Sequence, residues 1–247
     1  MTSAAYSSPD DANRYPRLAS DAAVEPHVFL EAVAPHLETR DVDALAKRLN
    51  EFGGSSRIIP LLDCSDTDVC KVAALSLGLV GCKACIPALT NMLKNPDAMA
   101  NQMAEHALWS IWFRGGNEES NQAVAQGAVA LNQKSLDEAA GHFSHAIMLD
   151  GDFAEAYNQR SIVRYLQERF GDSMADAERA TELMPEHFGA WAGLGHCHAH
   201  RGAIAEAVRC YREALAINPH LDCVRELVSE LEDCPDEPEQ DPFGDVT

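Results

Sequence analysis

Residues 189–219 read GAWAGLGHCHAHRGAIAEAVRCYREALAINP, and residues of the same types recur at intervals of 34 positions earlier in the chain. The recurrence runs without a gap from Ser120 to Leu221, so this stretch consists of three consecutive 34-residue units. Small residues occupy equivalent positions in all three units, at Gly127, Ser161 and Gly195 and again at Ala139, Ser173 and Ala207. A gapless repeat of this length indicates one structural unit that is stacked on copies of itself.

The period and its punctuation resemble the tetratricopeptide repeat (TPR), a helix–turn–helix unit. The third unit matches best, because its Trp, Leu, Gly, Ala, Tyr and Pro stand at the spacing of that family, at Trp191, Leu194, Gly195, Ala207, Tyr211 and Pro219. Other positions depart from the pattern: His198 replaces an aromatic residue, Arg160 and Arg164 replace Leu and Tyr, Ala123 replaces Trp, and Gly151 replaces Pro. The resemblance covers residues 120–233 if a closing helix is included.

The closing helix is predicted from the residues that follow the third unit. Apolar side chains recur at helical spacing, at Cys223, Val224, Leu227, Val228 and Leu231, while glutamates occupy the other face. Such an amphipathic helix is expected to cover the exposed apolar face of a last repeat. Together the pattern predicts helices over 121–133, 137–149, 155–167, 171–183, 189–201, 205–217 and 222–232.

Residues 27–116 show a different helical pattern. Val69 to Gly81 and then Ile86-Pro87-Ala88-Leu89 resemble the two helices of the short HEAT-type repeat found in bilin lyases and bacterial scaffolds. Ile58 to Leu62 resembles an earlier copy of the second helix, which suggests about three HEAT-like pairs. A first helix from Val28 is expected to be disturbed at Pro35. The alternative is a generic helical cap that happens to be rich in Ala and Leu.

The predicted fold is therefore all-α: a HEAT-like array over 27–116, then a TPR domain with its capping helix over 117–233, forming an alpha-alpha superhelix. Residues 1–26 and the acidic residues 234–247 are expected to be disordered tails. The link at Gly115 and Gly116 is short, so the two arrays should abut. Trp109, Trp112 and Phe113 precede the link and are predicted to pack between the arrays, with an exposed anchor for a partner as the alternative.

The charge of the chain restricts its partners. It carries 39 acidic and 19 basic side chains and a formal net charge of −20, most of it after residue 117. This balance disfavours nucleic acid as a partner, because binding there rests on phosphate contacts, and it would steer basic segments toward the repeats. We expect no membrane span, because no apolar run approaches 18 residues. Without a recognisable signal peptide, a cytoplasmic location with reduced cysteines is expected.

Two groups of residues invite a metal interpretation. Cys64, Cys70, Cys82 and Cys85 could supply zinc thiolates, or Cys82 and Cys85 a redox pair, but their spacing favours ordinary packing. His196 and His200 lie four residues apart on one helix face, like a two-His ligand pair, although no third ligand is indicated. We therefore predict no metal, no cofactor and no catalytic residues, because glycine-rich phosphate loops and nucleophile motifs are also missing from the sequence.

The resemblance to TPR proteins implies a binding function, because the first helices of successive units line a concave groove in that family. By alignment of the repeats, the predicted lining consists of Asn121, Val124, Ala128, Leu131, Asn132, Glu155, Asn158, Ile162, Tyr165, Leu166, Ala192, His196, Ala199 and His200. Co-chaperone members hold a C-terminal carboxylate through Lys, Arg and Asn, but Val124 and Ala128 replace two of these residues here.

The sequence thus predicts a non-enzymatic scaffold that binds an apolar, amphipathic or basic segment of a protein. The alternative, suggested by the HEAT-type resemblance, is a lyase or an accessory protein that handles a cofactor or metal.

Overall fold

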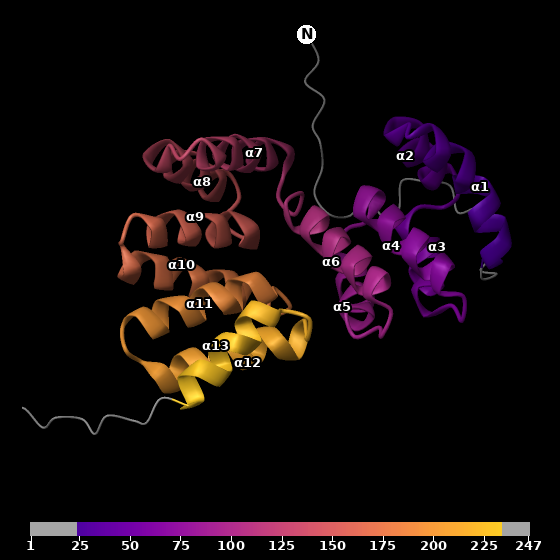
Figure 1. Cartoon of the computed structure of the whole chain (residues 1–247). Coiled ribbons are helices and arrows are strands. Elements are labelled where there is room, and N and C mark those ends of the chain that lie inside the picture. The colour runs from indigo at the N-terminus through magenta and orange to yellow at the C-terminus, as the bar shows by residue number, and fades with distance from the viewer. Residues whose placement is uncertain (1–23, 234–247) are drawn as a thin grey trace, which may run out of the picture.

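The computed structural model describes residues 24–233, and all regular secondary structure in that range is helical (Figure 1). The all-α prediction is confirmed. The predicted tails lie almost entirely outside the described residues; only the last residues of the N-terminal one are described, and Pro26 already opens the first helix. None of the described helices combines the length and the apolar character needed to cross a membrane.

The first array contains six α-helices and two short 3₁₀ helices within the described residues. They are α1 (Pro26–Thr39), α2 (Val42–Glu51), α3 (Ser55–Ile58), η2 (Ile59–Asp63), α4 (Thr67–Val80), η3 (Lys83–Cys85), α5 (Ile86–Met92) and α6 (Ala98–Trp112). Asp41, Asp66 and Asp97 begin α2, α4 and α6, and each side chain accepts a hydrogen bond from a backbone N–H of the first turn. Such caps satisfy N–H groups that have no partner inside the helix.

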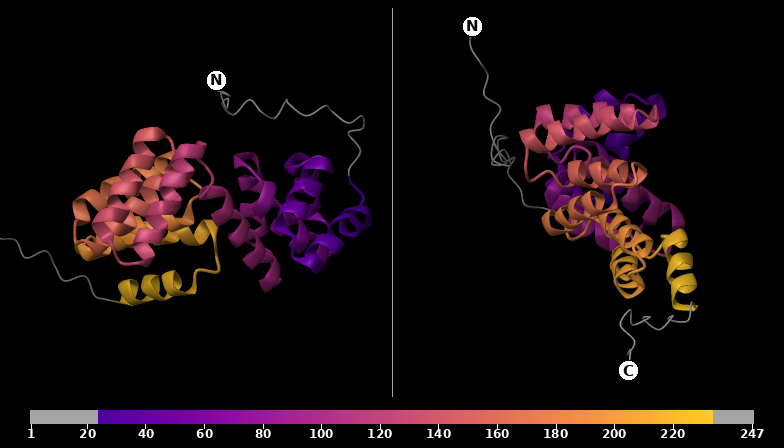
Figure 2. Two further views of the ribbon diagram at one scale, coloured as in Figure 1. Left: turned by 90° about the horizontal axis from the view of Figure 1, so that it is seen from above. Right: turned by 90° about the vertical axis from the view of Figure 1, so that its left-hand side faces the viewer.

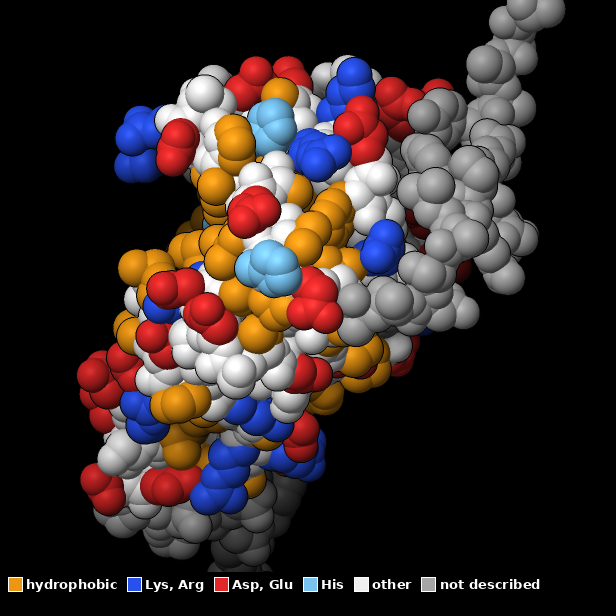
Figure 3. Space-filling view, turned by 90° about the vertical axis from the view of Figure 1, so that its right-hand side faces the viewer, with side chains coloured by type: hydrophobic (Ala, Val, Ile, Leu, Met, Phe, Trp, Pro, Cys, Tyr) orange, Lys and Arg blue, Asp and Glu red, His pale blue; other side chains and the backbone are white. Residues whose placement is uncertain are grey.

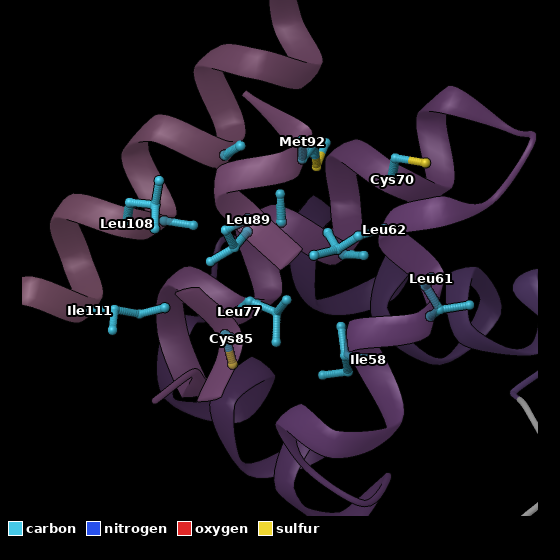
Figure 4. Packing of buried hydrophobic residues seen from close by; sticks show 14 of the residues in the cluster. Ile58, Leu61, Leu62, Cys70, Leu77, Cys85, Leu89, Met92, Leu108 and Ile111 are labelled. Atoms are coloured by element: carbon cyan, nitrogen blue, oxygen red, sulfur yellow. The ribbon is translucent and has the colours of Figure 1, made fainter. Parts of the chain in front are cut away.

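Helix α1 continues through Pro35 to Thr39, so the expected disturbance does not end the helix. Helices α2, α4 and α6 pack side by side and form one layer. A second layer, formed by η2 and α5, packs against α4 and α6. Leu62, Leu77, Leu89 and Leu108 meet in the apolar core between these layers (Figure 4). This two-layer arrangement is the observed structure; the resemblance to HEAT repeats stays a prediction.

The second array consists of three helical hairpins and a closing helix. The helices are α7 (Glu118–Asn132), α8 (Leu136–Leu149), α9 (Ala154–Leu166), α10 (Phe170–Leu183), α11 (Phe188–His200), α12 (Ile204–Ile217) and α13 (Asp222–Asp233). Apart from the start of α7, their ends lie within one residue of the predicted ones. The turn inside each hairpin has a left-handed residue at the same repeat position, at Lys134, Glu168 and Gly202.

Close approach of the two helices of a hairpin depends on glycine in the first and third units. A Cβ atom on Gly127 would lie 2.5 Å from Phe143, and one on Gly195 would lie 2.5 Å from Tyr211. Real Cβ contacts are not that short, so these positions accept only glycine without a shift of the ring. The closing helix α13 is present, and of its predicted apolar face only Val224 is fully buried, against Ala207 and Tyr211.

The first array lies beside the stack of three hairpins (Figures 1 and 2). It does not pack on α7 as a preceding repeat unit would. Helix α6 makes the contact with that stack, and it packs against the loops that precede α11 and α13. Trp112 stacks on His187 with ring centroids 4.0 Å apart, and Trp109 meets Phe188 edge-on at 5.5 Å. At the other end of α6, Asn101 lies 3.1 Å from His220. Trp112 is 2% exposed, so it packs between the arrays rather than serving as an exposed anchor.

The opposite end of the first array is a mixed surface. Seen from the side of α1, hydrophobic side chains lie among charged groups of both signs (Figure 3). Val28 and Val42 are 44% and 56% exposed there. Isolated exposed apolar residues of this kind are ordinary in folded proteins, so we place the functional site elsewhere.

Candidate functional site

The predicted groove residues all lie on α7, α9 and α11, the first helices of the three units, but they do not form one open surface. Val124, Glu155 and Asn158 are at most 1% exposed. Asn121 turns toward the junction, where its Oδ1 accepts from the N–H of Gly116 at 3.0 Å. Val124, Glu155 and Asn158 are therefore closed to a partner, and Asn121 is half-buried and holds the junction.

Glu155 is the centre of a buried polar network next to α6. Its carboxylate accepts hydrogen bonds from Gln159 Nε2 at 2.6 Å and Asn158 Nδ2 at 3.3 Å, and His187 Nε2 lies 2.6 Å from it. The other ring nitrogen of His187 accepts from the N–H of Ala190 at 3.1 Å, so the ring proton is on Nε2 and is donated to Glu155. Buried polar groups need such complete pairing. This network fixes α9 and α11 beneath Trp112.

The remaining groove residues include an open apolar and aromatic patch, which we define as Ile162, Tyr165, Leu166, His196 and His200. Ile162 and Leu166 are 37% and 53% exposed, although both are large hydrophobic residues. The ring of Tyr165 lies 6.4 Å from that of His196 and 6.3 Å from that of His200. These five residues lie on two neighbouring first helices, α9 and α11, and their assignment to a binding surface stays a prediction.

Phe170 belongs to this patch and was missed by the sequence analysis. Its ring stacks on His200 with centroids 3.5 Å apart and meets Tyr165 at 5.3 Å. The repeat alignment considered only first helices, whereas Phe170 opens the second helix α10. The signal that could have found it is its position directly after the left-handed turn, which brings it back beside the end of α9.

The hydrogen bond between Tyr211 and His196 sets the chemistry of the imidazole. Tyr211 Oη lies 2.7 Å from His196 Nδ1, and Tyr211 is only 1% exposed. Burial raises the pKa of Tyr211 to about 12, so the hydroxyl keeps its proton at neutral pH and donates it. His196 as a whole is exposed, but burial of its inner side lowers the pKa of the ring. The ring is therefore neutral, and Nε2–H is the edge left for a partner.

This bond also bears on the alternative metal interpretation. Tyr211 engages Nδ1 of His196, so only Nε2 of that ring is left to pair with His200 in a ligand set. Within residues 24–233, no three or more His, Cys, Asp or Glu side chains gather closely enough to hold a metal ion.

The other predicted groove residues flank the patch. Asn132 is exposed, while Ala128, Leu131, Ala192 and Ala199 are half-buried. Ala192 and Ala199 pack toward the cluster that α13 forms with Tyr211.

The two arginines that depart from the TPR pattern have a structural role. Arg160 donates two hydrogen bonds to Asp176, both at 2.8 Å, and Arg164 donates a third at 2.6 Å. Asp176 is 3% exposed, and desolvation lowers the pKa of Arg164. A buried carboxylate held by two guanidinium groups is stable only with such complete pairing. The second unit therefore replaces an apolar contact by an ionic one.

The cysteines of the first array are not gathered into one site. Cys70 and Cys85 belong to the buried apolar cluster, and burial raises the pKa of both thiols (Figure 4). Cys82 is exposed, and Cys64 is half-buried. Packing accounts for the two buried thiols, as it does for Cys197 and Cys210 in the second array.

Comparison with known proteins agrees with the repeat architecture. The family model for the tetratricopeptide repeat matches residues 189–221. The Hsp70-Hsp90 organizing protein of Triticum aestivum is 36% identical over 100 residues, which are 40% of this chain and only 17% of that protein. A TPR repeat-containing protein of Rhizobium etli is 25% identical over 138 residues, covering 56% of this chain and 67% of its own length.

Among solved structures, the first TPR of Spaghetti (RPAP3) bound to the HSP90 peptide SRMEEVD is similar at a TM-score of 0.46 and 16% identity, over 47% of this chain and 91% of that one. The family match confirms the predicted TPR repeat. The chain is therefore an all-α protein of the solenoid class that contains a tetratricopeptide repeat over residues 189–221.

Proposed function

We propose that the chain is a non-enzymatic interaction scaffold that holds a segment of a partner protein against the patch of Ile162, Tyr165, Leu166, His196 and His200. The observation that supports this proposal most is the exposure of Ile162 and Leu166 beside an aromatic cluster that is otherwise well packed. Exposed apolar residues that adjoin aromatic side chains are typical of binding anchors. The domain limits predicted above, 27–116 and 117–233, belong to the same proposal.

The chemistry of the patch points to an apolar or amphipathic segment. Neutral His196 offers a hydrogen-bond donor to a backbone carbonyl or a side-chain oxygen of the segment. The net charge of −20 favours basic residues on either side of it. A free C-terminal carboxylate is disfavoured, because Val124 is buried and neither it nor Ala128 can pair with an anion.

The test begins with peptides selected by display on the full chain and measures their affinity by calorimetry. Ile162→Ala with Leu166→Ala should weaken binding by about tenfold or more, because loss of anchor residues has that effect. Both residues are exposed, so the melting temperature should hardly change. Tyr165 is less suitable for this purpose, because it also packs against the core around Leu194.

A matched control comes from the first array. Val28→Ala with Met99→Ala removes apolar side chains that are 44% and 52% exposed outside the groove, and should leave affinity unchanged. The peptide SRMEEVD, which the Spaghetti (RPAP3) structure contains, serves as the carboxylate-bearing probe and should not bind. Equal loss in both double variants, or tight binding of SRMEEVD, would contradict the proposal.

A further inference from the structure

The outer face of the first TPR unit is exposed. The residues at equivalent repeat positions in the next two units are largely buried. Gln122, Ala125, Gln126, Val129 and Gln133 form an exposed stripe along α7, which we call the α7 stripe. One period later, Ala156 and Val163 are fully buried and Gln159 is 8% exposed. Two periods later, Ala190, Leu194 and Cys197 are at most 5% exposed. The repeat geometry therefore makes this face a helix-packing surface.

The contacts made by the second and third units show what covers the equivalent face. Gln167 donates to Asp137 of α8 at 2.8 Å, and Arg160 donates to Ser144 of α8 at 3.1 Å. Cys197 lies 3.2 Å from Ser173 of α10. In each case the cover is a helix of the preceding unit. The first unit has no preceding unit, and the first array contacts the side of the stack through α6 instead.

The α7 stripe is open and partly apolar. It lines a hollow together with Glu138 and His142 of α8, and Val129 is 56% exposed. A polar outer face on a terminal repeat would suffice for solubility. Val129 and Ala125 at the centre of the stripe are not needed for that purpose.

The charge of this face decides which occupant fits. From Ser120 to Gln133 the chain has no charged side chain, although its formal net charge is −20. Two copies of so acidic a chain repel each other over most of their surface, and the α7 stripe itself adds no charge to that repulsion, although Glu138 of α8 is among the residues that line the hollow. The ends of α7 are also complementary: Glu118 and Glu119 lie in its first turn and Lys134 directly after its last.

We propose that the α7 stripe is a homodimer interface, in which α7 packs antiparallel against α7 of a second copy. An antiparallel pair centred near Gln126 sets Glu118 and Glu119 of each copy beside Lys134 of the other. Ala125 and Val129 meet near the two-fold axis, and the glutamine amides pair with one another. A two-fold interface of this kind uses the same surface on both copies. The groove stays free in this dimer.

Sedimentation velocity of the full chain over a range of concentrations tests the proposal. The wild type should form a dimer by about 100 µM, as expected for a weak to moderate interface. Ala125→Glu with Val129→Glu places four carboxylates at the axis and should weaken the dimer by about 100-fold or more, because like charges across an interface repel strongly. Both positions are exposed, so circular dichroism and melting should match the wild type.

Two further variants keep the result specific. Ala175→Glu with Ala216→Glu adds the same charge at exposed positions of α10 and α12 and should leave the dimer intact. Glu118→Lys with Glu119→Lys should weaken it, and adding Lys134→Glu should restore it. A wild type that stays monomeric at about 100 µM, a dimer that tolerates Ala125→Glu with Val129→Glu, or a charge exchange without rescue would overturn the proposal. Ile162→Ala with Leu166→Ala should dimerise normally, so failure of the groove proposal is recognised separately.

Discussion

The second TPR unit and its two neighbours have the same backbone but pack their hairpins differently. In the first and third units a glycine lies against an aromatic ring, Gly127 against Phe143 and Gly195 against Tyr211. In the second unit the equivalent residues are Ser161 and Ala177, and the ring is gone. Arg160 and Arg164 with Asp176 make the ionic contact of that unit instead. Two units thus join their helices by apolar packing, and one joins them largely by paired charges.

The comparison shows that departures from a family pattern can be correlated. Arg160 and Arg164 look like losses when each is compared with the expected Leu and Tyr. Together with Asp176 on the facing helix, the two arginines form a fully paired ionic group. Removing one partner of a buried ion pair lowers the free energy of unfolding strongly, because it leaves a buried charge unpaired. The cost of shortening an apolar side chain instead grows with the cavity that is left. The second unit should therefore be the most sensitive to single changes of charge.

The largest effect is expected at Asp176. Asp176→Ala leaves two buried guanidinium groups without their acceptor and should lower the free energy of unfolding by about 3–5 kcal/mol. Asp172→Ala, which removes an exposed partner of Arg169, should lower it by less than about 1 kcal/mol. Urea unfolding followed by circular dichroism measures both. Equal effects of the two changes would show that the buried pairs contribute no more than a surface pair.

Alkaline pH should weaken the third unit through Tyr211. Its pKa is raised by burial to about 12, from an ordinary value near 10. The stabilising contribution is therefore complete below about pH 10, and is lost as pH rises through about 12, where about 2–3 kcal/mol is gone. Tyr211→Phe, which copies Phe143 of the first unit, should lack this part of the pH dependence. If the free energy of unfolding depends on pH in the same way in both proteins between about pH 9 and about pH 12, the hydroxyl does not titrate as a buried group.

A methyl group added to glycine should have opposite effects at two helical positions. Gly195→Ala sets a Cβ against the ring of Tyr211 and should destabilise by about 1–3 kcal/mol. Gly141→Ala on α8 meets nothing within 4 Å and should stabilise by about 0.5–1 kcal/mol through helix propensity. Thermal melting of both variants gives the comparison. Stabilisation by both would mean that the ring of Tyr211 moves aside without cost.

The smallest effect concerns the turns between the helices of a hairpin. Glu168 has φ of 61°, at the position where the third unit has Gly202 with φ of 75°. Residues other than glycine are strained in this left-handed region of the backbone. Glu168→Gly should therefore raise the free energy of unfolding by about 1 kcal/mol or less. Gly202→Ala should destabilise by a similar amount. A calorimetric scan resolves changes of this size, and a loss of stability in Glu168→Gly would contradict the strain argument.

Much of the second array could be predicted from the sequence because its determinants are local. The small residues and the apolar spacing that define each hairpin involve residues only a few helical turns apart. The 34-residue period repeats this local pattern. Helices α8 to α13 therefore end within one residue of the predicted positions. The same repeat alignment correctly placed Tyr165, His196 and His200 together on two adjacent helices. Phe170 was missed because it lies outside the helices that the alignment considered.

The sequence by itself determined the helical repeats, their order and the acidic character of the chain. Only the tertiary structure decided which part of the groove is open. Glu155 and Asn158 stand at groove positions in the repeat pattern, yet both are buried, because Glu155 pairs with Asn158 and with His187, the ring on which Trp112 of α6 stacks. Asn101 and His220, which join the other end of that contact, are 119 residues apart. Repeat periodicity reports which face of a helix is apolar, but not which distant helix packs on it, because that contact depends on the shape and pairing of both surfaces.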